Sequence, residues 1–361
     1  MGIEESQICN PSDREFLSVD ILNIVTSSLS LMGSALTIIS YIWKKVRRHR
    51  IQKQQIQQQQ QQIEKGGLLS SSITIGNGSS HYGGIGGGGG SGNGTGIGAI
   101  GGPHGTYKQP TSKLPLLIFM LSIADFFTSF FIIISQSYLI NNSKSYSTPY
   151  SPDLKIHFSP CIILRAIIQF FFLSTFFWTT CISYYLFHQL SSPGEEKYLL
   201  AIFNVVSWGI PFAISMVITM TNSIVVNSDG WCEVAKPMEL SLWFLPLFLC
   251  LLVCSIYYFR LRRLFRSKFE YRLQINDRLK QLDSTISRRL TLYIVVFVIC
   301  WLPDVIQHFI SFFSKCTFFP LLILQNILTP SQGFWNFWIY SYTNKIARFT
   351  PSNDENKRLL Q

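Results

Sequence analysis

Charged residues are scarce in this sequence. Of its 361 residues, 14% are Asp, Glu, Lys or Arg and 47% are hydrophobic, whereas a soluble domain carries about 25% charged residues. The charge that is present lies in blocks between long apolar stretches. This pattern is typical of repeated membrane spans and argues against a soluble globular domain.

The sequence also lacks the residue combinations of an enzyme, a metal centre or a phosphate-binding loop. It shows no nucleophile–base arrangement, and its eight cysteines have no metal-ligand spacing. The Gly-rich stretch around 83–102 is not followed by the Gly-Lys-Ser/Thr of a phosphate loop. We therefore expect no enzymatic activity, no cofactor and no metal site.

Seven apolar stretches are present, each with roughly the 20 mainly apolar residues that cross about 30 Å of hydrocarbon as a helix. Helices are expected because backbone groups in lipid must be paired within the segment. The predicted spans cover residues 17–43, 114–140, 160–190, 198–224, 240–260, 290–314 and 319–342. The predicted fold class is an all-α membrane protein, a seven-transmembrane helix bundle over residues 16–345.

Lys and Arg are unevenly distributed between the two sides of these spans. With the N-terminus outside, 24 of the 30 Lys and Arg residues fall on the cytosolic side and six on the outer side. The positive-inside rule then predicts an extracellular N-terminus (1–15) and a cytosolic tail (346–361) in a multi-pass cell-membrane protein. Because the net charge of +11 follows this topology, we expect contact with the lipid bilayer and none with nucleic acid.

Residues 51–112 differ in composition from the rest of the chain. They begin with a Gln run and continue through Gly-rich sequence. Such a composition cannot bury a core. The prediction is a disordered cytosolic loop between the first two spans.

Four cysteines fall on the predicted outer side, where a disulfide can persist. Cys161 opens span three and Cys232 lies in the second outer loop, so a bridge would pin that loop to span three; the alternative is two unpaired cysteines. Cys9 and Cys316 are the other two, and whether they form a second bridge is left open. Asn141 begins an Asn-Asn-Ser string on the same side, which predicts a glycosylation site.

Ionisable groups inside a membrane are costly and are functional candidates by default. Asp125 lies in the middle of span two and is predicted to face the bundle interior. It is interpreted either as a switch or ion-binding group, or as a hydrogen-bonded packing carboxylate.

Polar residues in the outer halves of spans three and six predict a ligand pocket. Arg165 and Gln169 lie one turn apart on the same face of span three. Arg165 could pair with an anionic ligand or reach the lipid headgroups. Asp304, Gln307 and His308 have i, i+3, i+4 spacing in span six and could form another wall of the pocket. The alternatives are solvation near the loop or an Asp304–Arg165 ion pair.

Spans six and seven carry residues that predict a conformational switch. Pro303 should kink span six, and Trp301 beside it is large enough to change packing between states. Span seven carries a polar stripe at helical spacing. Its members are Gln325, Thr329, Gln332 and Asn336. Interhelical hydrogen bonding is the simpler interpretation of the stripe, with a conformational role overlaid on it.

Seven spans, an outer Cys161–Cys232 clamp, a kinked sixth helix and a basic third cytosolic loop together resemble a G-protein-coupled receptor. Three strings resemble the cyclic-AMP receptor family: 293–301 in span six, 331–336 in span seven and 230–232 in the second outer loop. The resemblance covers most of residues 16–345 and is strongest in the last two spans. It implies a receptor for extracellular cyclic AMP that activates a heterotrimeric G protein.

The sequence departs from rhodopsin-type receptors at two motifs. Residues 183–188 read Ser-Tyr-Tyr-Leu-Phe-His where those receptors have Asp-Arg-Tyr, and their Asn-Pro pair in span seven is missing. The strings 300–303 and 124–125 are nevertheless similar to that class.

The cytosolic loop after span five alternates basic and apolar residues, which indicates an amphipathic extension of helix five. Its basic face could lie on acidic lipid or contact the G protein. The arginines predicted to make the G-protein contact are Arg262, Arg263, Arg266, Arg288 and Arg289.

Two other classes of membrane protein are weaker interpretations. An ion or solute transporter or channel would use Asp125 and the polar stripe of span seven, although no inverted repeat is visible. A retinal protein would need a lysine in span seven, and Lys315 and Lys345 lie outside it.

Overall fold

The computed structural model describes residues 13–70, 113–142, 160–191, 198–221, 223–226, 232–272, 277–313 and 318–349. One compact unit comprises Met1–Tyr41 and Lys113–Gln361, and the other comprises Ile42–Ser112. The long helices are α2 (Asp13–Ser70), α3 (Leu114–Asn142), α4 (Pro160–Ser191), α8 (Leu245–Arg272) and α9 (Asp277–Phe313). The shorter ones are α5 (Leu199–Asn204), α6 (Ile210–Met220), α7 (Lys236–Glu239), α10 (Phe319–Leu328) and α11 (Gln332–Phe349).

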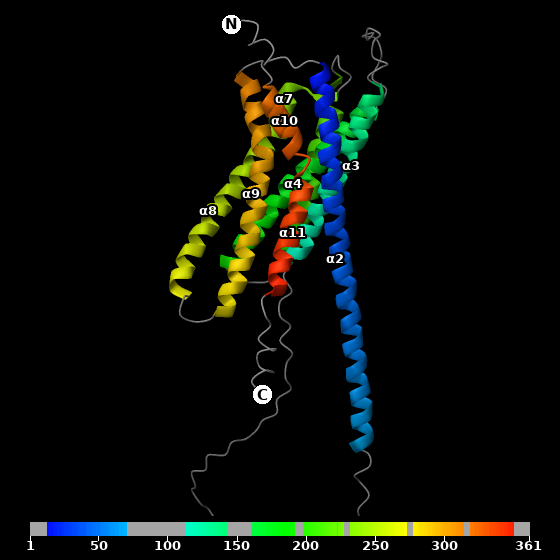
Figure 1. Cartoon of the computed structure of the whole chain (residues 1–361), viewed down its shortest axis with the longest axis vertical. Coiled ribbons are helices and arrows are strands. Elements are labelled where there is room, and N and C mark those ends of the chain that lie inside the picture. Colours follow the sequence, from blue (N-terminus) through cyan, green and yellow to red (C-terminus); the bar gives the residue numbers. More distant parts are fainter. Residues whose placement is uncertain are drawn as a thin grey trace, which may run out of the picture. The chain divides into compact units, whose positions relative to one another are not determined.

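Helix α4 is the central element of the first unit. It contacts α3, α6, α8 and α9, while α9 also contacts α10 and α11 (Figure 1). The interior between these helices is aromatic, and its largest fully buried side chains include Trp178, Trp301, Phe176 and Phe297. The other helices of this unit are therefore packed around α4.

The part of α2 before Tyr41 has its polarity reversed relative to a helix of a soluble protein. Its buried residues are mostly small and polar: Asn23, Thr26, Ser27, Ser30, Ser34 and Thr37. Its exposed residues are large and apolar, and include Ile21, Val25, Met32, Leu36 and Ile39. Polar groups that face inward and apolar groups that face outward are expected where the surrounding solvent is lipid.

Six of the described helical segments are long and apolar enough to cross a membrane, by length and composition. Residues 319–342, the predicted seventh span, do not form one continuous helix. They consist of two helices, α10 and α11, with a turn at 329–331 between them. The prediction of one continuous helix there is wrong, although the chain is a helical membrane bundle as expected.

Pro330 explains the break in the last span. A proline has no backbone N–H, so Pro330 cannot donate to the carbonyl of Asn326 four residues earlier. The Thr26 hydroxyl of α2 donates to that carbonyl instead, at 3.2 Å. The Asn23 side-chain amide also donates to the Asn326 side chain at 2.7 Å. The backbone group left by the proline is thus satisfied by a neighbouring helix, as a membrane interior requires.

Two further prolines follow wide helical turns. The π-helical turns η2 (Val205–Gly209) and η3 (Leu240–Phe244) lie just before Pro211 and Pro246. A π-helical turn is a common local adjustment inside an α-helix where the regular hydrogen-bond ladder is interrupted. Trp243 of η3 is thereby placed in the core, where it is 6% exposed.

A small hairpin lies in the predicted second outer loop. Strand β1 (Ile224–Val226) pairs antiparallel with β2 (Cys232–Val234), with Ile224 opposite Val234. Both residues are buried in one apolar cluster that Ile162 and Ala166 of α4 pack against. The hairpin is therefore held against the first turns of α4. It was not predicted, because three-residue strands are too short to show an alternating pattern.

The Gln-rich segment differs from its prediction in part. Helix α2 continues to Ser70, so residues 51–70 are helical rather than disordered. Gln, Lys and Arg are good helix formers, and no Gly or Pro lies between Gly33 and Gly66. Once a helix is nucleated, each added residue gains a hydrogen bond at little cost. The remainder of the predicted loop, 71–112, lies outside the described residues.

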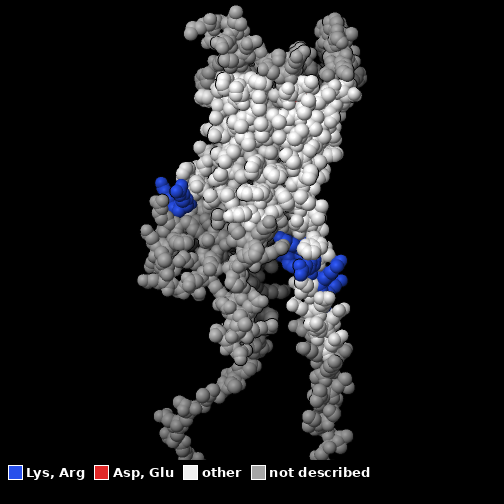
Figure 2. Space-filling model, viewed as in Figure 1, with Lys and Arg blue, Asp and Glu red and all other residues white. Residues whose placement is uncertain are grey.

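The visible face of the helical bundle is almost without charge. Figure 2 shows it as uncharged residues, with basic side chains in two groups, one on α8 where that helix leaves the apolar surface and one on α2 beyond Tyr41. Arg260, Arg262 and Arg263 are exposed on that part of α8. This distribution matches a lipid-facing belt that ends at a basic rim.

Candidate functional site

Four aromatic side chains form a buried layer between α4, η3 and α9. We call Phe172, Phe176, Trp243 and Trp301 the aromatic layer. The Trp301 ring centroid lies 4.4 Å from that of Phe176, 5.3 Å from Phe172 and 5.9 Å from Trp243. Trp301 is fully buried. Edge-to-face geometry at these distances fixes the ring positions.

The ring contacts also set the register between α4 and α9. Phe172 contacts Trp301, and Phe176, one turn later in α4, contacts Phe297, one turn earlier in α9. The two helices therefore run antiparallel. Three residues beyond this layer, Gln169 of α4 comes to the same level as Asp304 of α9, because both helices rise about 1.5 Å per residue.

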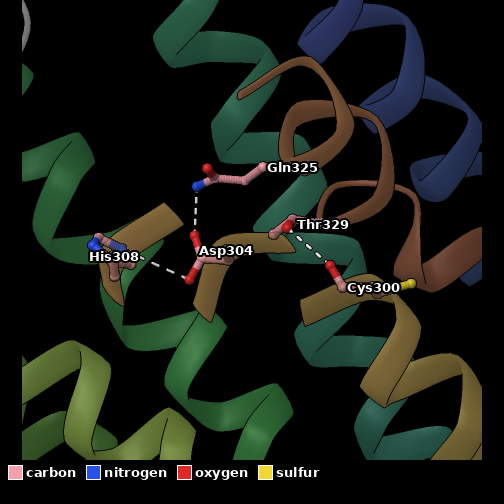
Figure 3. A network of polar contacts seen from close by, with 5 residues as sticks. All are labelled: Cys300, Asp304, His308, Gln325 and Thr329. Carbon is pink, nitrogen blue, oxygen red and sulfur yellow. Dashed lines mark hydrogen bonds and ion pairs between the residues drawn. The ribbon is translucent and has the colours of Figure 1, made fainter. Parts of the chain in front are cut away.

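Asp304 is the centre of a polar network between α9 and α10, drawn in Figure 3. The Gln325 amide of α10 donates to Asp304 Oδ1 at 2.5 Å, and His308 Nε2 lies 3.8 Å from Oδ2. One turn away, the Thr329 hydroxyl donates to the carbonyl of Cys300 at 3.2 Å. Asp304 is 3% exposed, so this carboxyl group is held by side chains rather than by bulk water.

Several buried polar atoms around Asp304 have no hydrogen-bond partner within the described part of the chain. They are Arg165 Nε, both amide atoms of Gln169, Asp304 Oδ2, Gln307 Oε1 and Gln325 Oε1. We call these five residues, with His308, the outer polar site. Buried polar atoms are almost always hydrogen-bonded in proteins, so such a cluster marks a place where a polar molecule can bind.

Charges of both signs meet at the outer polar site. His308, Glu239 and Arg165 all act electrostatically on the Asp304 carboxyl group, and the Trp243 side chain acts on it as a hydrogen-bond donor. No ion pair joins Arg165 to Asp304 within the described residues, which is the alternative that the sequence had left open. Arg165 and Asp304 therefore attract each other over a distance too long for an ion pair.

A second polar region lies on the other side of the aromatic layer. This inner polar cavity is lined by Ser30, Asp125, Thr128, Ser129, Phe172, Thr175, Thr329, Pro330, Gln332 and Gly333. The Asn336 amide donates to Asp125 Oδ2 at 2.8 Å. Ser30 Oγ accepts from Ser129 Oγ at 2.8 Å and from the Gly333 N–H at 3.1 Å. Asp125, Ser30 and Ser129 are therefore paired across α2, α3 and α11, while Gln332 Nε2 has no hydrogen-bond partner among the described residues.

Trp301 connects the two polar regions. Its indole N–H donates to Gln332 Oε1 at 2.6 Å, and Gln332 lines the inner polar cavity. The ring of the same residue packs in the aromatic layer three residues from Asp304. A movement of α9 at the outer polar site would therefore change a hydrogen bond at the inner cavity.

Some predicted site residues lie outside the described positions or side chains. Cys9 and Cys316 are not described, and the side chains of Cys161 and Cys232 are not described although their backbones are. The same holds for the side chains of Arg266, Arg288 and Arg289. Arg262 and Arg263 are exposed on α8, and Asn141 is exposed in the last turn of α3. The disulfides, the glycosylation and the G-protein contacts remain predictions.

Two partners of the site were missed by sequence reasoning. Gln325 was assigned to the span-seven stripe, but it donates to Asp304 of the outer polar site. It lies in α10, which is a separate helix from α11, where Gln332 and Asn336 lie. Ser30 was not singled out, although it bridges α3 and α11. Small polar residues at helical spacing in the first span were the signal that could have found it.

Comparisons with known proteins identify related chains. A family model described as slime mold cyclic AMP receptor matches residues 120–353. Cyclic AMP receptor-like protein B of Dictyostelium discoideum is 31% identical over 247 residues, which cover 66% of this chain and 52% of that protein. Cyclic AMP receptor-like protein D of the same organism is 28% identical over 286 residues, 63% of this chain and 59% of that protein.

A human relative matches a shorter part of the chain. G-protein coupled receptor 157 of Homo sapiens is 28% identical over 145 residues, 38% of this chain and 39% of that protein. All three relatives are named as receptors or receptor-like proteins, not as enzymes. The chain spans about half the length of the two Dictyostelium discoideum relatives. The match over residues 120–353, which includes the described helices from most of α3 to α11, shows that the chain belongs to the slime mold cyclic AMP receptor family.

Proposed function

We propose that this chain is a seven-span cell-membrane receptor that binds an extracellular small molecule and activates a heterotrimeric G protein. The observation that carries the proposal is the position of Trp301, which packs beside the outer polar site and hydrogen-bonds Gln332 of the inner cavity. One buried side chain thus belongs to both regions. The family membership and the relatives' names support the receptor class.

The proposed topology places the outer polar site toward the extracellular side. The N-terminus is outside, and the basic ends of α8 and α9 are in the cytosol, because 24 of the 30 Lys and Arg residues then lie inside. Arg262 and Arg263 are exposed there and are available to a G protein or to acidic lipid. The charge distribution supports this orientation.

Ligand binding would act through the contacts of Asp304. A ligand shifts a conformational equilibrium only by binding one state more tightly than the other. A ligand that replaces Gln325 at the Asp304 carboxyl group would release a contact between α9 and α10. The Trp301–Gln332 bond, one turn below in α9, would then report that change to α11.

Cyclic AMP is the first ligand to test, because the names of the relatives supply it. Its phosphate is an anion, and Arg165 is the cation of the outer polar site with an unpaired nitrogen. Lys155, His157 and Lys315 lie outside the described residues, and the Lys236 side chain is not described. Their contribution to an anion site remains a prediction.

A transporter or channel is the second candidate function. The observation that favours it is the inner polar cavity, which places Asp125 among hydroxyl groups inside the bundle. The broken span formed by α10 and α11 is also a feature that some transporters share. A path would require these groups to lie along a continuous polar route.

Ligand-dependent guanine-nucleotide exchange on a heterotrimeric G protein separates the two functions. We expect exchange in membranes that contain the full chain and none in matched membranes without it. Ion or solute flux into vesicles, without any effect on nucleotide exchange, would replace the receptor by the transporter.

A further inference from the structure

We infer that the outer polar site takes a small zwitterion, with its cationic group against Asp304 and its anionic group against Arg165. This inference rests on the proposed function, since it assigns a chemical class to the same receptor's ligand. It concerns described residues of α4, α7, α9 and α10.

The outer polar site contains charged groups of both signs. It contains the Arg165 guanidinium, the His308 imidazole and the Asp304 carboxyl group, and Glu239 acts on that carboxyl group electrostatically. A simple anion that approached Arg165 would be repelled by these acidic groups, because Coulomb energies are large where water is excluded. A simple cation would meet the opposite problem at Arg165. A molecule that carries both charges avoids both penalties.

The Arg165 guanidinium and the Asp304 carboxyl group are too far apart to form an ion pair. Arg165 and Asp304 interact electrostatically, yet no ion pair joins them among the described side chains. Arg165 Nε and Asp304 Oδ2 have no hydrogen bond among the described residues, and the His308 imidazole lies beside Oδ2, at 3.8 Å. A molecule with an ammonium at one end and a carboxylate at the other can satisfy both atoms at once, with charge-assisted hydrogen bonds.

Neutral glutamine side chains complete the outer polar site. Gln169 is 1% exposed and has both an unpaired donor and an unpaired acceptor. Gln307 and Gln325 each have an unpaired acceptor oxygen. An ammonium group has three donors to distribute among such acceptors, whereas the Gln169 amide can donate to a carboxylate. The unpaired atoms of the site therefore match both ends of a zwitterion.

The test uses the full chain in nanodiscs of neutral lipid, with ligand affinity measured from the dose-dependent rise in melting temperature. The zwitterionic probes are glycine, β-alanine, γ-aminobutyrate and 5-aminovalerate, which differ only in the separation of their charges. Butyrate and butylamine are the matched single-charge probes, and cyclic AMP is tested beside them. We expect at least one zwitterion to bind about tenfold or more tightly than both single-charge probes.

Substitutions distinguish recognition from folding, because they are judged by selectivity within one variant. Asp304→Asn should weaken the zwitterion about tenfold while leaving butyrate unchanged or stronger, and Arg165→Gln should weaken the zwitterion and butyrate together. Arg260→Gln removes an exposed charge from α8 and should change no probe. If no zwitterion binds more tightly than butyrate and butylamine, the inference is overturned.

The inference and the receptor proposal fail in different ways. Nucleotide exchange stimulated by cyclic AMP, with no binding of any zwitterion, would remove the ligand class and keep the receptor. Zwitterion binding with the expected selectivity, but without nucleotide exchange on any heterotrimeric G protein supplied, would keep the ligand class and remove the receptor.

Discussion

The outer polar site and the inner polar cavity are both buried and both polar, but they differ in how their groups are paired. In the inner cavity Asp125 bonds Asn336, and Ser30 bridges two helices. In the outer site Gln169 has no hydrogen bond to either amide atom, and Asp304 Oδ2 and Arg165 Nε also have none among the described residues. A paired network holds helices together, whereas an unpaired one is available to a ligand. The comparison assigns a structural role to one region and a binding role to the other.

The largest expected effect comes from adding a side chain where α2 and α11 approach each other beside the inner polar cavity. A Cβ atom added to Gly33 of α2 would lie 2.8 Å from Phe334 Cα of α11 and 3.1 Å from the Gly333 carbonyl oxygen. Both are backbone atoms and cannot rotate away. We expect Gly33→Ala to lower the free energy of unfolding by about 3 kcal/mol, as overpacking does. Denaturant unfolding in detergent micelles measures it.

Gly209→Ala is the matched control for that substitution. An added Cβ there would lie 3.8 Å from Val205 Cγ1, an ordinary contact. This variant should be neutral or slightly stabilised, because alanine favours a helix more than glycine does. An equal fall in the free energy of unfolding of both variants would show that the close contact between α2 and α11 is not the cause of the loss.

A smaller loss is expected when a paired group of the inner cavity loses its partner. Asn336→Leu leaves the Asp125 carboxyl group without its amide donor. We expect the free energy of unfolding to fall by about 2 kcal/mol, because an unpaired buried acceptor keeps its desolvation cost.

A double-variant cycle tests that explanation. The second variant, Asp125→Leu with Asn336→Leu, removes both partners and should recover part of the loss. Additive losses in the cycle would show that the two side chains do not act as a pair, and would weaken the contrast with the outer site.

The outer site should respond in the opposite direction. Gln169→Leu removes a buried amide whose donor and acceptor are both unpaired within the described residues. Without ligand, the variant should gain about 1 kcal/mol in the free energy of unfolding, because an unsatisfied polar group is removed. The same variant should lose ligand-induced stabilisation, which a thermal melt with and without the zwitterion series measures. A destabilised variant would place Gln169 in the structural network instead.

Part of this arrangement could be predicted from the sequence. Long apolar runs located the helices, and Asp125, which is buried, was predicted to face the bundle interior because lipid would not accept its carboxyl group. The broken last span was missed because its composition stays apolar on both sides of Pro330. The helix over 51–70 was missed because composition reports solvation, not helix propagation from a preceding span.

Pairings between distant residues were beyond sequence reasoning. Asp125 and Asn336 are 211 residues apart, and Asn23 and Asn326 are 303 apart. Which polar residues meet depends on the rotation and register of each helix, and these are set by side-chain packing such as the Phe172–Trp301 contact. The sequence therefore placed the outer pocket in spans three and six, but it assigned Gln325 to the span-seven stripe and not to Asp304.

The claim that most needs testing is that Trp301 couples the two regions. Trp301→Phe keeps an aromatic ring in the layer but removes the N–H that Gln332 accepts, and Trp338→Phe, at an exposed position of α11, is the control. Guanine-nucleotide exchange would be measured in membranes with cyclic AMP and the four amino acids as stimuli, beside ligand binding to each variant. The account predicts that Trp301→Phe retains binding but loses most of the stimulated exchange, while Trp338→Phe retains both. Stimulated exchange that is unchanged in Trp301→Phe would contradict it.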